Sequence, residues 1–202
     1  MSSRKRTLII VAILLASMLI SLITNLTVSL VQKGSYPRKY SEFVEKYASE
    51  YNVPEYIIYS VISTESDFEP KKKSTSGAYG LMQTDASTLK LLSSYEHLNE
   101  KVSLEDLSDP DIAIRYGTYY LRYLFDKFHK WNVAFAAYNT SEAQVLEWLN
   151  DTEYSKDGAT LKKIPDKDTR QYLKKLNKAL PSNSDLIPYY SILVYNNNSV
   201  NI

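Results

Sequence analysis

The stretch IIYSVISTESDFEPKKKSTSGAYGLMQ, residues 57–83, decides how this chain is interpreted. Ile58, Val61 and Ile62 fall on one face of a 3.6-residue helix, and the same face ends at Glu65. A carboxyl group on a half-buried apolar stripe has its charged form disfavoured, so it is suited to donate a proton near neutral pH. The competing interpretation is an ordinary glutamate at a helix end that faces water. A turn rich in glycine and hydroxyl groups, residues 74–83, follows directly.

The N-terminal segment is far more apolar than the rest of the chain. Residues 8–31 contain no charged residue, and as a helix they would span about 36 Å, enough to cross a hydrocarbon core of about 30 Å. The basic cluster at residues 4–6 only slightly favours a cytoplasmic N-terminus, because other basic residues follow the run closely. We expect residues 1–7 to be cytoplasmic and residues 8–31 to be an uncleaved transmembrane anchor. A cleaved signal peptide, whose apolar stretch is usually about 7–15 residues, is the alternative.

Residues 34–202 have the size of one domain with a proper core. They hold 20 Lys and Arg against 23 Asp and Glu, and this net charge of −3 argues against nucleic-acid binding. The chain has no cysteine, which excludes disulfides, thiolate metal sites, a cysteine nucleophile and lipid attachment through cysteine. His97 and His129 are far apart in sequence and form no HExxH-like pair, so we expect neither a metal site nor a cofactor.

Helical periodicity dominates residues 40–180 and predicts an all-α domain with short connections. Residues 32–39 are expected to be a linker between this domain and the anchor. Apolar spacing and helix-start signals predict helices over residues 40–51, 54–65, 81–92, 112–128, 131–138, 142–149 and 168–180. Residues 181–202 form a C-terminal tail, and its apolar part, residues 185–195, either packs on the domain or forms an edge strand.

Four sequence motifs follow one another between residues 40 and 176. They read ESDFEPKKKSTSGAYGLMQ at residues 65–83, DPDIAIRYGTYYL at 109–121, AAYNTSEAQVLEWL at 136–149 and IPDKDTRQY at 164–172. Together these motifs resemble the signature of the SLT-type peptidoglycan lytic transglycosylases. Four motifs in the family's order are a far stronger signal than any one of them. The resemblance implies a lysozyme-like, multi-helix catalytic domain over residues 40–180.

The resemblance also implies a substrate and a reaction. The substrate would be a peptidoglycan glycan strand, cleaved at the β-1,4 bond between N-acetylmuramic acid and N-acetylglucosamine. Breaking a glycosidic bond requires a protonated acid at the leaving oxygen, and Glu65 is the candidate. In this family one glutamate acts as acid and then as base, taking the proton of the sugar's own 6-hydroxyl to close a 1,6-anhydro ring. The catalytic domain would lie outside the cell membrane and face the wall.

Substrate-binding roles are carried over to six residues: Ser74, Gly77, Met82, Gln83, Tyr138 and Asn139. Ser74 would hydrogen-bond the Glu65 carboxyl or the substrate, and Gly77, like Gly80, would let the backbone approach the sugar. Met82 and Gln83 would line the cleft.

Tyr138 would stabilise the charge that develops on the sugar ring, with Asn139 beside it. The structural alternatives are a turn-capping serine, a turn glycine, a core methionine and a buried Tyr–Asn pair. Arg170 is expected to be a structural ion-pair partner.

The sequence departs from the family at three positions: Ser141, Ala86 and Ala113 stand where glycine, proline and asparagine are usual. A turn with positive φ at Ser141 would be strained. Asp85 is the nearby acid that could make the protein an ordinary lysozyme-like hydrolase if it faced Glu65 across the cleft. A non-catalytic peptidoglycan-binding module is the remaining alternative.

Overall fold

A computed structural model of the 202-residue chain describes residues 3–34, 39–95, 98 and 101–181. Within the first helix, side chains are described at residue 5 and at residues 9–24. The chain divides into two compact units, residues 1–38 and residues 39–202. The apolar part of the tail at residues 185–195 lies outside the described residues, so its predicted role is not addressed by the structure.

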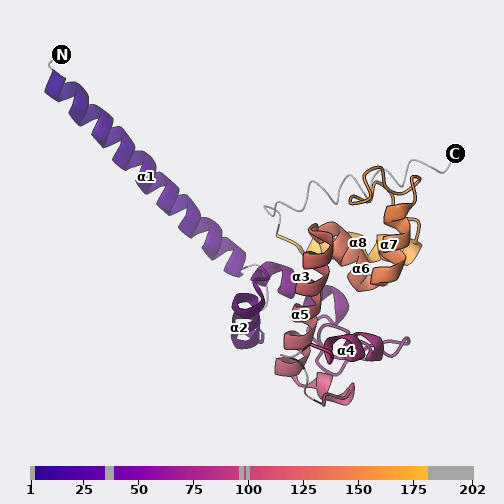
Figure 1. Ribbon diagram of the computed structural model, residues 1–202. Helices are drawn as coiled ribbons and strands as arrows, with labels where there is room; N and C mark the ends of the chain where they lie inside the picture. Colours follow the sequence, from indigo (N-terminus) through magenta and orange to yellow (C-terminus); the bar gives the residue numbers. More distant parts are fainter. Residues whose placement is uncertain (1–2, 35–38, 96–97, 99–100, 182–202) are drawn as a thin grey trace. The chain divides into compact units, whose positions relative to one another are not determined.

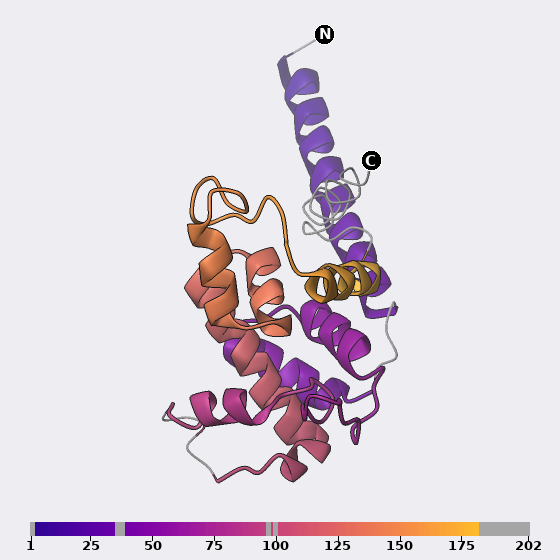
Figure 2. The same ribbon diagram turned by 90° about the vertical axis from the view of Figure 1, so that its right-hand side faces the viewer.

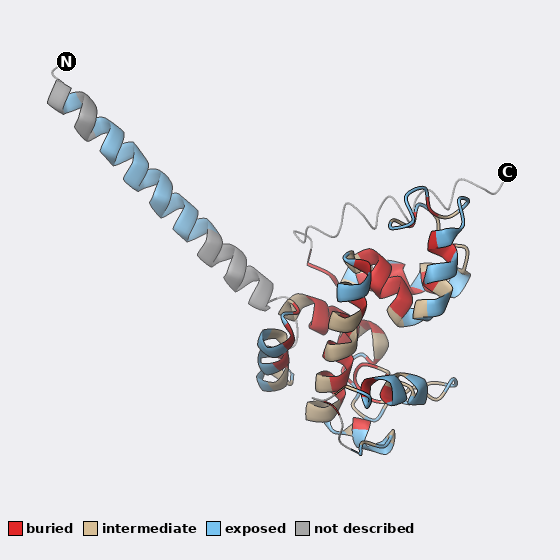
Figure 3. Cartoon of the chain, viewed as in Figure 1, coloured by how far each residue is buried: buried red, intermediate tan, exposed pale blue. Residues whose placement is uncertain are grey.

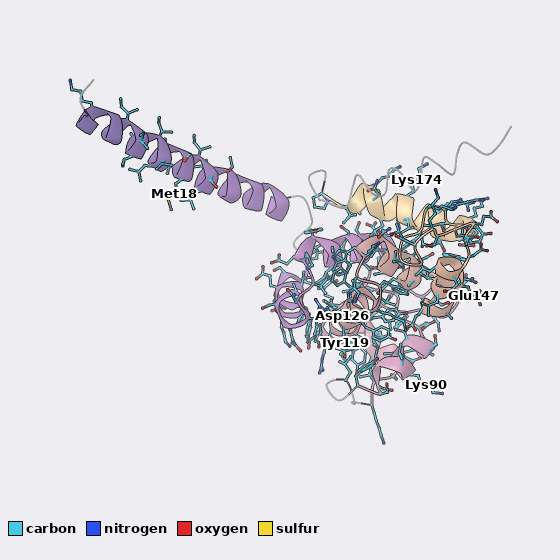
Figure 4. The ribbon with its side chains drawn as sticks, turned by 45° about the horizontal axis from the view of Figure 1, so that its top comes forward. Met18, Lys90, Tyr119, Asp126, Glu147 and Lys174 are labelled. Carbon is cyan, nitrogen blue, oxygen red and sulfur yellow. The ribbon has the colours of Figure 1, made fainter. Side chains whose placement is uncertain are left out.

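The first unit consists of the helix α1 (Ser3–Gly34), whose described apolar side chains are exposed (Figure 3). Met18, labelled in Figure 4, is 73% exposed. The linker expected at residues 32–39 begins inside this helix, because α1 continues to Gly34. Of the helices in the described ranges, none is both long enough and apolar enough to cross a membrane. The transmembrane segment at residues 8–31 stays a prediction.

The second unit is built from helices joined by loops and short antiparallel bridges, as the sequence predicted (Figure 1). Its elements are α2 (Ser41–Tyr51), α3 (Glu55–Glu65), α4 (Ala86–Leu92), the 3-10 helix η2 (Glu105–Ser108), α5 (Pro110–Phe128), α6 (Trp131–Asn139), α7 (Glu142–Asn150) and α8 (Lys167–Ala179). The predicted helix bounds agree with these elements to within two residues, with one exception.

The exception is the helix predicted at residues 81–92, which begins only at Ala86. The preceding residues form a turn because Tyr79 and Thr84 exchange backbone hydrogen bonds of 3.0 and 3.1 Å, and Gln83 adopts a φ of 50°. Asp85 then starts α4 as its N-cap, accepting the backbone N–H of Thr88 at 2.7 Å. The prediction was therefore wrong over the first turn.

The helix α5 is the centre of the second unit and packs against α2, α4, α6 and η2 (Figure 1). Asp109 caps its start by accepting the N–H of Asp111 at 2.8 Å, and Pro110 occupies the first turn. Leu121 and Leu124 on its inner face are fully buried, and burial of each such side chain contributes about 2 kcal/mol. This helix is thus the rigid frame on which the loops rest.

The helix α3 packs between α2 and α8, and its contact with α8 can be followed in Figure 2. Ile57, Ile58, Val61 and Ile62 are all fully buried, as the helical spacing predicted. Because three turns of α3 are held in the core, the position of its last residue, Glu65, is fixed by packing rather than by the loop that follows.

Two glycines of the loop between α3 and α4 are expected to respond very differently to alanine. Gly80 has a φ of +82°, and a Cβ there would lie 2.2 Å from the Leu107 carbonyl oxygen. Gly77 has a φ of +93° but open space around its Cβ position. We expect Gly80→Ala to lower the free energy of unfolding by about 3 kcal/mol or more, and Gly77→Ala by about 1 kcal/mol. Urea denaturation measures the free energy of unfolding of both variants. Equal losses in the two variants would contradict the close approach of Gly80 to the Leu107 carbonyl.

Candidate active site

A cavity of about 240 Å³ opens in the second unit where α3, α5 and the α6–α7 connection meet the loop that precedes α4. Its walls come from five parts of the chain. The lining residues are Glu65, Ser74, Ser76, Ala78, Gln83, Thr84, Asp85, Ser87, Thr88, Tyr120, Tyr138, Asn139, Thr140 and Ser141. The lining is mostly polar, which suits a ligand that carries many hydroxyl and amide groups.

Glu65 is the last residue of α3, and its carboxyl reaches the cavity from the apolar core. The chain turns away immediately after it, since Asp67 and Phe68 both adopt positive φ values, 53° and 64°. Burial raises the pKa of the Glu65 carboxyl to about 7, although the hydroxyl of Tyr172 and the charges of Lys175 and Lys72 oppose the rise. The carboxyl is therefore balanced between its protonated and charged forms near neutral pH.

Tyr138 lies at the end of α6 and lines the same cavity. Its hydroxyl donates to the Met82 carbonyl oxygen at 2.8 Å, and its ring centroid is 5.3 Å from that of Tyr120. Burial, together with the negative charge of Glu65, raises the pKa of Tyr138 well above its ordinary value. Tyr138 is thus a neutral hydroxyl beside Glu65, and the exposed Asn139 follows it on the cavity wall.

Ser74 and Gln83 line the cavity but direct their hydrogen bonds into the loop. The Ser74 hydroxyl accepts the N–H of Ala78 at 2.9 Å and lies 2.8 Å from the Ser76 hydroxyl. The Gln83 side-chain amide donates to the carbonyl oxygens of Lys72 and Gly80, at 3.0 and 2.8 Å. These hydrogen bonds stabilise the loop. The bonds of Ser74 are those expected of a serine that caps a turn, which was the structural alternative to a role in substrate binding.

Met82 and Gly77 do not line the cavity. The Met82 side chain is fully buried, with its sulfur 3.9 Å from the Thr118 hydroxyl and packed against Gly117. Its backbone carbonyl, rather than its side chain, serves the site by accepting from Tyr138. Gly77 has a positive φ and donates its N–H to the Ser74 carbonyl oxygen at 3.2 Å within the turn, and its predicted approach to the sugar stays a prediction.

Asp85 lines the cavity, but its carboxylate is occupied by the first turn of α4. One oxygen accepts the N–H of Thr88 at 2.7 Å, and the Ser87 hydroxyl lies 2.9 Å from both oxygens. Burial raises the pKa of Asp85, but the hydrogen bonds from Thr88 and Ser87 outweigh burial and bring it below its ordinary value. Asp85 is therefore charged at neutral pH and held by its own helix.

The structure also answers the predictions for Ser141 and Arg170. Ser141 has an extended conformation, with φ −174°, so a strained positive φ at this position is not found. Its hydroxyl caps α7 by accepting the N–H of Gln144 at 3.1 Å. Arg170 donates to the carbonyl oxygens of Ile164 and Pro165, at 2.8 and 2.6 Å, and its charge adds to the hydrogen bonds from Thr169 that lower the pKa of Asp166.

The contribution of α8 to the site was not predicted from the sequence. Tyr172 belongs to the closing motif, but no role was expected for it, and Lys175 belongs to no motif. Both act on the Glu65 carboxyl, and they lie three residues apart on one face of the helix. The spacing of Tyr172 and Lys175 was the signal that could have linked them to one role. The spacing alone does not indicate which face of α8 packs against α3.

The chain matches the family model described as "Transglycosylase SLT domain" over residues 42–161. This chain belongs to the transglycosylase SLT domain family. Over 145 residues it is 32% identical to the soluble lytic murein transglycosylase of Escherichia coli K12, covering 69% of this chain and 22% of that protein. Over 94 residues it is 34% identical to membrane-bound lytic murein transglycosylase E of Buchnera aphidicola, covering 45% of this chain and 42% of that protein.

Solved structures place the SLT domain in the lysozyme-like class that the resemblance implied. An inactive glutamate-to-glutamine variant of lytic transglycosylase Slt from Pseudomonas aeruginosa superposes with a TM-score of 0.60 at 28% identity, covering 71% of this chain and 24% of that one. A 70-kDa soluble lytic transglycosylase bound to bulgecin A gives a TM-score of 0.62 at 27% identity, with coverages of 71% and 24%. The chain thus spans about a quarter or less of the length of these larger relatives.

The raised pKa of Glu65 predicts a pH-dependent cost to stability. Between the ordinary carboxyl pKa and about 7 the folded state binds more protons than the unfolded state, so stability falls as pH rises through this window. Glutamine cannot ionise, and we expect Glu65→Gln to be more stable than the wild type at pH 8 by up to about 3 kcal/mol, with a smaller difference at pH 4.

Thermal unfolding of both proteins at the two pH values measures this difference. Glu69→Gln is the matched control, because Glu69 is exposed and lies in the loop after the same helix. A gain in Glu65→Gln that is the same at pH 4 and pH 8 would show that the Glu65 carboxyl is not destabilised by burial.

Proposed function

We propose that this protein is a lytic transglycosylase that cleaves the β-1,4 bond between N-acetylmuramic acid and N-acetylglucosamine in peptidoglycan, leaving a 1,6-anhydro-muramic end. The observation that carries the proposal is a partly exposed carboxyl in a polar cavity whose pKa is raised to about 7. Membership of the SLT family and the names of its relatives support the substrate.

In the proposed reaction Glu65 begins protonated and gives its proton to the glycosidic oxygen as the bond to the anomeric carbon breaks. The resulting carboxylate then takes the proton of the 6-hydroxyl, whose oxygen closes the anhydro ring on that carbon. One residue therefore serves both halves, and a pKa near 7 suits both because neither form is strongly disfavoured. Tyr138, a neutral hydroxyl beside Glu65, is the candidate to stabilise the charged sugar ring.

A hydrolase is the second candidate, because Asp85 is a charged carboxylate on the same cavity wall. A base or nucleophile needs a lone pair directed at water or sugar. The Asp85 oxygens accept from Thr88 and Ser87, which favours the single-acid reaction. A binding module without catalysis would not need a carboxyl with a raised pKa, so the site favours an enzyme.

Two variants separate these functions. We expect Glu65→Gln to lower the rate of muropeptide release by about 10²-fold or more, because the general acid is lost. Asp85→Asn should retain most of the rate, since the asparagine side chain still caps α4. Digestion of purified peptidoglycan by the full-length protein in detergent, followed by mass spectrometry, measures both rates and the product.

Anhydro-muropeptides are lighter than the hydrolysis product by one water, so the product mass distinguishes transglycosylase from muramidase. Reducing-end products together with an inactive Asp85→Asn variant would favour the hydrolase. Equal release by wild type and Glu65→Gln would favour a binding module whose apparent activity came from a contaminant.

We also propose that residues 8–31 anchor the protein in the cytoplasmic membrane by a single span, with residues 1–7 inside and the SLT domain facing the wall. The support is the uncharged run of 24 residues and the exposure of apolar side chains such as Ile13 and Leu14 along a 32-residue helix. One relative is named a membrane-bound enzyme.

Fractionation tests the anchor. The wild-type chain, expressed in bacterial cells, should stay with membranes through alkaline carbonate washing and leave them only in detergent. A double variant, Leu15→Arg with Leu19→Arg, should be released, because each arginine at the centre of a span costs about 2.5–3.5 kcal/mol. The double variant Leu15→Ala with Leu19→Ala is the control and should stay bound. Release of the wild type by carbonate would contradict the anchor.

A further inference from the structure

The end of α3 is held by a helix that lies beyond the residues matching the SLT family model. That match ends at residue 161, whereas α8 spans Lys167–Ala179. The Lys175 ammonium donates a hydrogen bond to the carbonyl oxygen of Thr64, the residue before Glu65. This contact joins residues that are 111 positions apart in the sequence.

We propose that Lys175 is a positioning residue of the active site, which fixes the last turn of α3 and places a positive charge near the Glu65 carboxyl without forming an ion pair with it. This inference rests on the proposed function of Glu65 as acid and then base. Lys175 does not line the cavity, so it acts through Glu65 and not by touching the glycan.

The hydrogen bond meets a need that every helix end has. The last four carbonyl groups of a helix have no partner within it, and a cation is favoured there by the helix dipole. After α3 the backbone turns sharply through two consecutive positive-φ residues, Asp67 and Phe68, so the helix cannot continue. Lys175 gives the Thr64 carbonyl a charged donor and thereby fixes the turn that carries Glu65.

The charge of Lys175 acts in the direction the second half of the reaction requires. Burial disfavours the Glu65 carboxylate, while Lys175 and Lys72 favour it, and both lower its pKa. Neither lysine lies within ion-pair distance of a carboxylate in the described parts of the chain. Their charge is therefore available to Glu65, which must become a carboxylate to take the proton of the 6-hydroxyl.

The other titratable groups around Glu65 do not supply this charge. Tyr172 on α8 presents a hydroxyl that favours the carboxylate but brings no positive charge. Tyr138 on α6 is neutral as well, and Asp85 at the start of α4 is negative. Lys72, in the loop before α4, also carries a positive charge that lowers the pKa of Glu65, but among the described residues its side chain donates no hydrogen bond to α3. A comparison of the two lysines therefore distinguishes the effect of a positive charge, which both supply, from the hydrogen bond to α3, which Lys175 supplies.

The test compares Lys175→Met with Lys175→Arg, Lys72→Met and Lys174→Met in the full-length protein. Lys174, labelled in Figure 4, is the matched control, since it is exposed on α8 as Lys175 is, but only Lys175 bonds the Thr64 carbonyl and lowers the pKa of Glu65. The Glu65 carboxyl is titrated by carbon NMR on protein labelled at glutamate, with its signal assigned by its loss in Glu65→Gln. This measurement does not depend on any activity, so it remains decisive even if the proposed reaction is wrong.

We expect Lys175→Met to raise the pH at which Glu65 is half titrated, because a nearby positive charge is lost. The alkaline limb of the pH–activity profile should move to higher pH by the same amount. The kcat on peptidoglycan should fall by roughly tenfold with KM nearly unchanged, as small displacements of a reacting group produce. Lys175→Arg should restore both values. Lys72→Met should raise the midpoint with a smaller loss of kcat.

Two results would overturn the proposal. One is a Lys175→Met protein whose Glu65 midpoint and kcat match the wild type. The other is a Lys174→Met protein that changes both quantities as much as Lys175→Met does, because that would reflect the general charge of α8. If Lys175→Met does not fold, the comparison of Lys175→Arg with Lys175→Gln decides, since glutamine retains a donor without the charge and should reproduce the raised midpoint.

Discussion

The burial of one carboxyl group at the end of α3 is the constraint on which the site depends. Burial disfavours the charged form of Glu65, and the buried side chains of α3 fix the position of the helix end that carries it. The surroundings therefore determine how easily the charge can appear. Tyr172 and Lys175 from α8 and Lys72 from the loop all favour the charged form, which brings the pKa to about 7 rather than higher.

The cavity wall opposite is made rigid by hydrogen bonds to backbone carbonyl groups. Gln83 closes the loop on itself through the carbonyls of Lys72 and Gly80, and Tyr138 binds the carbonyl of Met82 from α6. Gly80 allows the loop to approach η2 so closely that a Cβ would clash with it. A polar wall held in this way can present hydroxyl and amide groups to a sugar without first having to be ordered, which lowers the entropic cost of binding.

The predictable part of the structure is the part determined by short-range periodicity. The apolar spacing of α3 gave its buried face and placed Glu65 at its end, because burial of a helix repeats every 3.6 residues. The burial of Met82 could not be read in this way, since it depends on Thr118, which lies 36 residues away. The start of α4 and the contact of Lys175 with Thr64 likewise depend on tertiary pairing rather than on local pattern.

A single acid that must also act as a base cannot be optimised for either task alone. Deeper burial of Glu65 would keep it protonated and favour bond cleavage, but it would delay removal of the 6-hydroxyl proton. A more solvated carboxyl would be charged too often to begin the reaction. Enzymes with two carboxylates divide these tasks, whereas here Asp85 is committed to capping α4. Under the proposed mechanism the reaction therefore depends on the balance at one residue, set by burial on one side and by cations on the other.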